Sequence, residues 1–236
     1  MIERMINSHT EVILALDVEN RSKAESILEK TGEQLRWVKI GLQTYLRDGP
    51  EFLRDVASMG KFIFLDLKLH DIPNTMAKAM ESLAQLPIKM LTIHATAGPE
   101  ALRKCVLTAK DILPEVQLLS VTVLTSMNQD NLNSIGIQSL VPDQVDRLAK
   151  LSIDSGVTGI VSSPLELVRL RPILPHNTTF VTPGIRPKGS SKGDQKRVMT
   201  PREAAEKGAN YLVIGRPILA SDDPRGSLSL IQEELS

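Results

Sequence analysis

The chain of 236 residues is poor in cysteine, which limits how its fold can be stabilised. Cys105 is its only cysteine, so no disulfide can form within the chain. The residues around Cys105 have an amphipathic helical pattern, which favours a buried, inert thiol over a nucleophile. Folding without disulfides is typical of a reducing compartment, and we expect a cytoplasmic protein.

The chain also has no excess of charge of either sign, few aromatic side chains and no long apolar run. Basic and acidic residues number 28 each, so no overall field would attract nucleic acid or acidic lipids. One Trp and two Tyr are too few for a surface that stacks single-stranded bases. No apolar run approaches the ~18 residues that span a bilayer, and residues 1–10 lack the apolar core of a secretion signal. We therefore predict neither a nucleic-acid partner nor a membrane association.

Eight short apolar runs alternate with amphipathic segments. They are mostly unbroken by polar residues, as expected for parallel strands covered on both sides. This alternation predicts a single (β/α)8 TIM barrel, an α/β fold, as one domain over residues 1–236. The rival architecture, an open doubly wound sheet, would carry a G-x-G-x-x-G after its first strand, and this chain carries none there. The runs begin at Val12, Trp37, Lys61, Lys89, Gln117, Gly159, Thr178 and Tyr211.

Capping patterns predict where several helices begin. Ser22 and Glu25 have the spacing of a capping box, and Thr200 and Glu203 repeat it. The segment Asp48-Gly-Pro-Glu51 predicts the start of the second helix, because proline is favoured in the first helical turn. Residues 127–138 are polar and form the least regular part of the pattern.

Residues 64–75 hold the densest set of charged groups that follow an apolar run. Asp66 and Lys68 lie two positions apart, so an extended backbone projects both to one side. Asp71 falls at the strand-to-helix turn, because Pro73 suits the first position of a helix. Alternating charges at this range keep one another ionised and can carry a proton. By themselves, however, Asp66 and Lys68 could form a solvated pair, and Asp71 could merely cap the helix.

Polar residues also end the other apolar runs. Because active sites of barrels lie at the carboxyl ends of the strands, these residues should share one rim. A lysine within a short apolar run, such as Lys39, must reach water or a carboxylate. The residues are Asp17, Lys39, His94, Thr125, Ser126, Gly184 with Arg186, and Gly215 with Arg216.

The last two strands predict a phosphate site. Gly184 and Gly215 would let the backbone approach an anion, and Arg186 and Arg216 would supply charge and forked hydrogen bonds. The loop 187–194, rich in Gly, Ser and Lys, could close over the phosphate. No histidine pair has the spacing of a metal site, and we predict none, although ligand type alone would allow magnesium between two aspartates.

The stretch D-x-K-x-x-D-I-P-N-T, from Asp66 to Thr75, resembles the signature of bacterial orotidine 5′-phosphate decarboxylases. The resemblance covers nearly the whole chain, with matching motifs in the same order. A mild departure is Thr96-Ala97, where many members have glycine. The other matching motifs are Ala15–Asp17, Val38–Gly41, Val121–Ser126, Thr182–Arg186, Asp194-Gln195 and Ile214–Arg216.

The resemblance implies decarboxylation of orotidine 5′-phosphate to uridine 5′-phosphate in pyrimidine synthesis, with no metal and no cofactor. It implies four charged groups that act together, Lys39, Asp66, Lys68 and Asp71, in which Lys68 protonates C6 and Asp66 lies near the departing carboxylate. It also implies a homodimer, with Asp71 and Thr75 contributed across the interface. The implied substrate contacts are Asp17 and Lys39 to the ribose, Thr125 and Ser126 to the pyrimidine, and Arg186, Gln195, Gly215 and Arg216 to the phosphate.

Two other functions stay open at this point. Magnesium-dependent sugar-phosphate lyases and decarboxylases of the same barrel superfamily, such as hexulose-phosphate synthases, share D-x-K-x-x-D but would lack the I-P-N-T and T-P-G-I-R context. A non-catalytic nucleotide sensor would keep Arg186 and Arg216 but would not need all four charged residues. The sequence also leaves open whether Asp66 repels the substrate carboxylate or orients Lys68.

Overall fold

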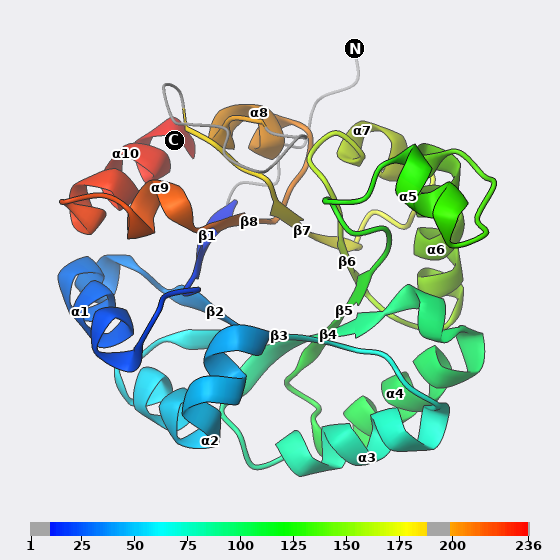
Figure 1. The fold of residues 1–236 in the computed structure, drawn as a ribbon, viewed down its shortest axis with the longest axis horizontal. Coiled ribbons are helices and arrows are strands. Elements are labelled where there is room, and N and C mark those ends of the chain that lie inside the picture. Colours follow the sequence, from blue (N-terminus) through cyan, green and yellow to red (C-terminus); the bar gives the residue numbers. More distant parts are fainter. Residues whose placement is uncertain (1–9, 188–198, 236) are drawn as a thin grey trace.

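The computed structural model describes residues 10–187 and 199–235, and eight parallel strands in it close into a barrel (Figure 1). Each strand pairs with the next along the chain, and the last pairs with the first. The predicted (β/α)8 TIM barrel is confirmed. The strands are β1 (Glu11–Ala15), β2 (Trp37–Gly41), β3 (Phe62–Leu69), β4 (Ile88–His94), β5 (Gln117–Val121), β6 (Gly159–Val161), β7 (Thr179–Pro183) and β8 (Tyr211–Ile214).

Helices form a ring around the barrel (Figure 1). Two short 3-10 turns, Gly32–Gln34 and Ala95–Ala97, lie among them. The helices are α1 (Arg21–Thr31), α2 (Leu42–Ser58), α3 (Pro73–Leu83), α4 (Pro99–Ile112), α5 (Gln129–Ser134), α6 (Val141–Asp154), α7 (Leu167–Leu170), α8 (Pro201–Glu206), α9 (Arg216–Leu219) and α10 (Pro224–Leu235).

The apolar core has two layers, because successive side chains of a strand point to opposite faces. The outer layer packs strands against helices and includes Leu14, Ile40 and Phe52, each at most 1% exposed. The inner layer fills the barrel with side chains such as Phe64 and Leu119. Each fully buried side chain of this size contributes roughly 1.5–3 kcal/mol. The packed interior therefore closes the barrel beneath the carboxyl ends of the strands.

Two predicted helix starts are wrong. Helix α1 is capped by Asn20, whose side chain accepts a hydrogen bond of 2.9 Å from the Lys23 N–H, so Ser22 is already helical. Helix α2 begins at Leu42, directly after β2, and its backbone breaks at Gly49. The glycine–proline signal therefore marks a kink inside α2, since Gly49 (φ 69°) leaves the helical conformation before Pro50 restarts it.

The capping box at Thr200 and Glu203 is confirmed at the start of α8. The polar segment 127–138 holds the short helix α5, which a second capping box at Asn128 starts. The sequence pattern missed α5 because the segment has few apolar residues to mark a helical face.

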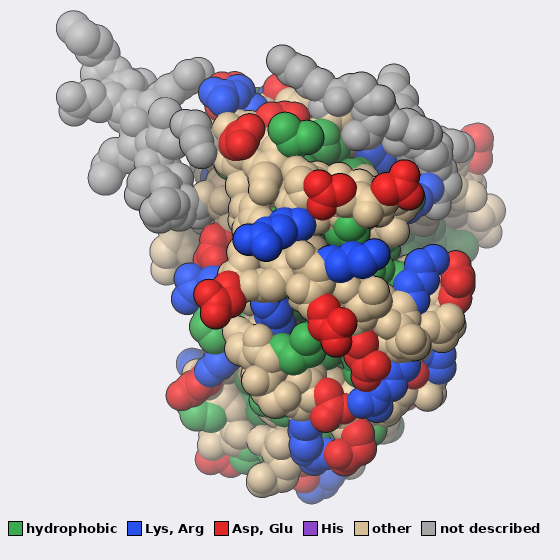
Figure 2. Space-filling view, turned by 90° about the vertical axis from the view of Figure 1, so that its left-hand side faces the viewer, with side chains coloured by type: hydrophobic (Ala, Val, Ile, Leu, Met, Phe, Trp, Pro, Cys, Tyr) green, Lys and Arg blue, Asp and Glu red, His purple; other side chains and the backbone are tan. Residues whose placement is uncertain are grey.

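Charges of both signs are mixed on the face shown in Figure 2, which is the left-hand side of Figure 1. Among the described residues on this face, neither sign gathers into a large patch. Within the described ranges, no helix has the length and apolarity to cross a membrane.

Candidate active site

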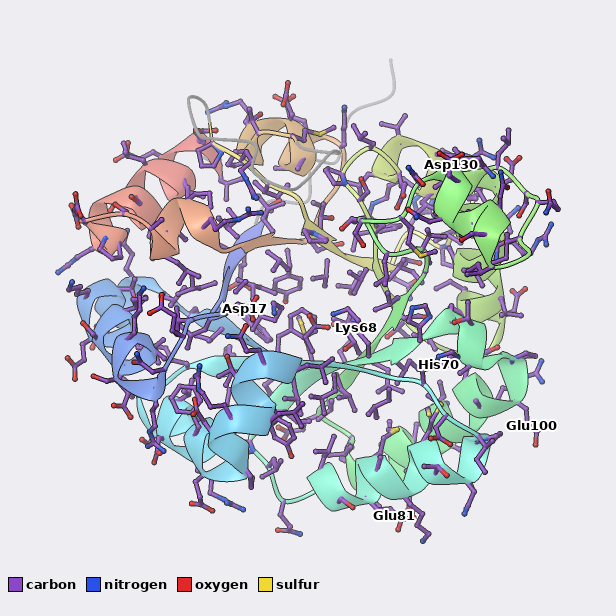
Figure 3. All side chains as sticks on the ribbon, in the orientation of Figure 1. Asp17, Lys68, His70, Glu81, Glu100 and Asp130 are labelled. Carbon is purple, nitrogen blue, oxygen red and sulfur yellow. The ribbon has the colours of Figure 1, made fainter. Side chains whose placement is uncertain are left out.

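Four side chains of alternating charge meet at the carboxyl ends of β1, β2 and β3. Lys39 Nζ lies 3.1 Å from Asp17 Oδ2 and 3.5 Å from Asp66 Oδ2. Lys68 Nζ lies 2.8 Å from Asp66 Oδ1 and 2.9 Å from Asp66 Oδ2. Figure 3 shows Asp17 and Lys68 near the barrel axis, whereas Glu81 and Glu100 lie on the outer rim. We call these four residues, Asp17, Lys39, Asp66 and Lys68, the charged array.

Burial makes the array depend on its internal pairing. Lys39 and Asp66 are each only 8% exposed. A buried charge is costly unless it is paired and hydrogen-bonded, and Asp66 has both ammonium groups as partners. Burial alone would raise the pKa of the Asp66 carboxyl, but Lys39, Lys68 and a hydrogen bond from Thr92 together hold that pKa below its usual range. Asp66 is therefore ionised at neutral pH.

The segment that carries Asp17 is anchored by the first turns of α2. The Thr44 hydroxyl donates to the Leu16 carbonyl at 3.0 Å, and Arg47 donates to the Val18 carbonyl at 2.5 Å. Gly41, between Lys39 and α2, lies against the array. A Cβ on Gly41 would lie 2.8 Å from Lys39 Nζ and 3.1 Å from Asp17 Oδ1.

Thr92 of β4 is a member of the site that the sequence patterns did not identify. Its hydroxyl is buried, accepts a hydrogen bond of 2.8 Å from the Lys68 N–H and donates one of 3.0 Å to Asp66 Oδ1. The sequence did show a polar residue inside the apolar run from Lys89 to His94. Threonine is common in strands, however, so Thr92 alone did not indicate a functional residue.

Among the described residues, Asp71 and Thr75 form no ion pair or side-chain hydrogen bond with the array of their own chain. Both side chains are exposed, on the turn from β3 to α3 and on the first turn of α3. Asp71 Oδ1 accepts a hydrogen bond of 2.7 Å from the Ile72 N–H, and among the described residues Asp71 forms no ion pair with Lys68. The expectation that Asp66, Lys68 and Asp71 crowd one strand end therefore holds within a single chain only for the first two.

The other predicted site residues lie at the ends of β5, β7 and β8. Thr125 is half-buried and Ser126 is exposed in the turn after β5. Arg186 is buried just after β7, and Arg216 opens α9 directly after Gly215. In Figure 1, β7 and β8 lie across the barrel from β3. Gln195 and residues 188–194 of the predicted loop fall outside the described residues.

His94, at the end of β4, forms a second polar cluster beside Lys68. Its Nδ1 lies 2.7 Å from the Thr96 hydroxyl oxygen, and its ring centroid lies 5.3 Å from that of His70. Burial first, and then the nearby charges of His70 and Lys68, lower the pKa of His94 to about 4. The imidazole of His94 is therefore neutral at physiological pH.

Comparison with known proteins gives this geometry a context. The sequence model of the "Orotidine 5'-phosphate decarboxylase / HUMPS family" matches residues 10–231. The chain belongs to this family. It is 48% identical to Orotidine 5'-phosphate decarboxylase of Opitutus terrae over 95% of this chain and 98% of that protein. It is 44% identical to the protein of that name from Nitrosococcus oceani, over 95% and 97% of the two chains.

Solved structures show the same likeness. The crystal structure of Orotidine 5'-phosphate decarboxylase from Lactobacillus acidophilus has a TM-score of 0.86 and 34% identity, covering 97% of this chain and all of that one. An uncharacterized conserved protein from Geobacillus kaustophilus has a TM-score of 0.85 and 28% identity, covering 95% of this chain. The resemblance seen in the D-x-K-x-x-D-I-P-N-T motif is therefore confirmed at the level of the family.

In a member of this family, replacing Gly41 by alanine is expected to disturb the array without unfolding the barrel. Gly41 has an extended backbone that any residue adopts, and the nearest atom to a new Cβ is the mobile end of Lys39. The ammonium group must therefore move away. We expect enzymatic turnover to fall about ten- to a hundred-fold, the scale on which small displacements of reacting groups act. Thermal unfolding should change little, and a large drop in the melting temperature together with unchanged turnover would contradict this account.

The neutral His94 predicts a pH-dependent stability. Its pKa is 6.5 in the unfolded chain and about 4 in the folded one, so between these values the unfolded chain binds a proton that the folded chain does not. Stability should therefore fall on acidification through this window, by roughly 1–2 kcal/mol for a partly buried group. Chemical denaturation at pH 4 to 7 should show a flatter profile for His94→Gln. The matched control is His176→Gln, which removes an exposed imidazole, and equal slopes in both variants would contradict the prediction.

Proposed function

We propose that this chain decarboxylates orotidine 5′-phosphate to uridine 5′-phosphate and carbon dioxide, using neither metal nor organic cofactor. The observation that carries the proposal is the charged array at the carboxyl end of the barrel. Curated relatives 40–48% identical over about 95% of the chain bear the name of that activity, which supports the choice of substrate.

In the proposed reaction, Lys68 supplies the proton. The bond from C6 to the carboxylate carbon breaks, carbon dioxide leaves, and the electron pair stays on C6. A proton then passes from Lys68 Nζ to C6, and water reprotonates the amine. Little resonance stabilises the carbanion, so a fixed ammonium group beside C6 lowers the energy of the transition state more than that of the substrate. Asp66 keeps Lys68 charged and in place, since both its oxygens accept from Nζ.

That geometry supports an orienting role for Asp66. A carboxylate paired with two ammonium groups has much of its charge compensated, which weakens any repulsion of the substrate carboxylate. In the proposed reaction Asp66 still lies near the departing carboxylate of the substrate, because it is next to Lys68. We assign Asp66 mainly to fixing the ammonium group.

The remaining contacts suit an elongated nucleotide. Asp17 and Lys39 would hold the ribose hydroxyls, and Thr125 and Ser126 the pyrimidine edge. Arg186, Gly215 and Arg216, with Gln195 beyond the described residues, would hold the phosphate. Arg186, Gly215 and Arg216 follow β7 and β8, which lie across the barrel from β3, the strand that carries Lys68 (Figure 1). Binding energy gained at the phosphate can thus be used to hold the reacting carbon in the array.

We also propose that the active form is a homodimer whose sites are completed across the interface. Asp71 and Thr75 are exposed within one chain, and Ile72 between them is 66% exposed. All three side chains are therefore accessible to a partner subunit. In the proposal, Asp71 reaches Lys68 of the partner subunit and completes the array of alternating charges.

A cytoplasmic location belongs to the same proposal. Cys105 is fully buried, and burial raises the pKa of its thiol to about 11, so the thiol is protonated and shielded from oxidation. A fold that relies on no disulfide fits the reducing compartment in which nucleotides are made.

The rival that the sequence left open is a magnesium-dependent sugar-phosphate enzyme of the same barrel superfamily, and the matching family description covers a second group, HUMPS, beside the decarboxylases. The Lys39 ammonium group bridges Asp17 and Asp66. It neutralises the carboxylates that a metal ion would need as ligands, and this arrangement favours the metal-free reaction. The two functions separate when purified protein is given either orotidine 5′-phosphate alone or a hexulose 6-phosphate with magnesium. Formation of uridine 5′-phosphate in the first assay supports the proposal, and turnover only in the second would overturn it.

A further inference from the structure

The backbone that carries Lys68 departs from regular strand geometry. Pairing of β3 with β4 runs from Leu65↔Leu91 to Leu69↔Ile93, so the three β3 residues from Asp66 to Lys68 face the single β4 residue Thr92. A bulge of this kind re-aims side chains next to an active site. Lys68 has a φ of 50°, and it is the one non-glycine residue with positive φ in the described ranges. This left-handed conformation is unfavourable for residues that have a Cβ, and it persists only where surrounding interactions stabilise it.

The backbone of Lys68 at this bulge is hydrogen-bonded to the Thr92 hydroxyl. At the bulge, the Lys68 N–H donates to Thr92 Oγ1 at 2.8 Å, and the same hydroxyl donates to Asp66 Oδ1 at 3.0 Å. Lys68 Nζ returns to Asp66 at 2.8 Å, which closes a ring of hydrogen bonds through both ends of the lysine. Thr92 is 0% exposed, so no bulk water can replace its hydroxyl.

We propose that Thr92 is a positioning residue for the reaction, whose hydroxyl fixes both the bulged backbone of Lys68 and the carboxylate of Asp66. This inference rests on the proposed function, because it assigns Thr92 to the placement of the proton donor. Thr92 does not touch the reacting atoms. It sets where the ammonium group lies relative to C6. Its loss should therefore affect the chemical step more than substrate binding, because the proposed phosphate contacts that hold the substrate are on other strands.

Two pairs of variants isolate the hydroxyl. Thr92→Val keeps the shape of the side chain and removes the hydroxyl, whereas Thr92→Ser keeps the hydroxyl and removes the methyl group. We expect Thr92→Val to lower kcat about ten- to a hundred-fold with KM changed less than about threefold, and Thr92→Ser to stay within about fivefold of wild type. If Thr92→Val does not fold, Thr92→Ala against Thr92→Ser makes the same comparison, since they differ only in the hydroxyl.

The pH profile adds a readout that a merely structural role would not change. The Thr92 hydrogen bond is one of the interactions that lower the pKa of Asp66, beside those of Lys39 and Lys68. Its loss should move the acid limb of the kcat profile to higher pH in Thr92→Val and not in Thr92→Ser. Thr178→Val is the matched control, because Thr178 is a buried threonine at the amino-terminal end of β7 whose hydroxyl has no partner among the described residues.

Each outcome decides the inference. A selective loss of kcat in the variants without the hydroxyl, with Thr178→Val at the wild-type rate, supports it. Equal losses in Thr92→Ser and Thr92→Ala, or a kcat for Thr92→Val within twofold of wild type, would overturn it. Wild-type protein in the same assay tests the proposed function separately: if it does not turn over orotidine 5′-phosphate, the proposed function fails, whatever the variants do.

Discussion

Replacing Lys68 by alanine is expected to abolish turnover of orotidine 5′-phosphate and to leave nucleotide binding measurable. Lys68 would supply both the proton and the positive charge beside C6, contributions worth about 10²–10⁴-fold and about 10²–10³-fold when measured singly. A combined loss of about 10⁴-fold or more is therefore expected. The proposed phosphate and ribose contacts are on other strands, so uridine 5′-phosphate should still bind in an equilibrium titration.

The matched control for this variant is Lys23→Ala, which removes an exposed lysine of α1 that pairs with Glu19. Exposed pairs of this kind contribute at most about 1 kcal/mol to stability, and the control should have wild-type turnover. Turnover of Lys68→Ala within tenfold of wild type would exclude Lys68 as the proton donor.

Mixing two inactive variants is expected to restore activity if the site is shared between subunits. Lys68→Ala and Asp71→Ala would each be inactive alone. In a hybrid dimer, one site lacks both residues and the other has both, because Lys68 and Asp71 of one site come from different chains. Random exchange makes about half of the dimers hybrid, so about a quarter of the wild-type activity should return in a symmetric two-site dimer.

A second mixture provides the control for subunit exchange. Lys39 and Lys68 belong to one chain's array, so Lys39→Ala mixed with Lys68→Ala forms no intact site. That mixture should stay inactive. If native mass spectrometry shows hybrid dimers and the mixture of Lys68→Ala with Asp71→Ala still has no activity, Asp71 does not act across the interface.

The sequence predicted the barrel because the evidence for it is periodic. Unbroken apolar runs alternating with amphipathic segments require parallel strands covered by helices, and neither register nor side-chain detail is needed for that inference. The charged residues that follow these runs could also be assigned to one rim. Lys39 illustrates this: a lysine in an apolar strand was expected to reach water or a carboxylate, and the structure pairs it with Asp17 and Asp66.

The parts that the sequence did not predict depend on local geometry. Asp66 and Lys68 do share one side, but regular alternation is not the whole reason, since Lys68 lies in a bulge with positive φ. No residue type in β3 signals that bulge. Thr92 was missed for a related reason: a threonine in a strand is ordinary, and only its position opposite the bulge makes it a member of the site. The start of α2 was misplaced because Gly49-Pro50 looks like a helix start and is a kink.

The most direct test of the central claim is loss of the orotate absorbance when chelator-treated protein is added to orotidine 5′-phosphate. The claim is that an array of protein charges, with no metal, carries out the decarboxylation. It predicts full activity in excess chelator, with uridine 5′-phosphate and carbon dioxide formed in equal amounts. Folded protein that binds the nucleotide but leaves the absorbance unchanged, or that needs added magnesium to change it, would contradict the claim.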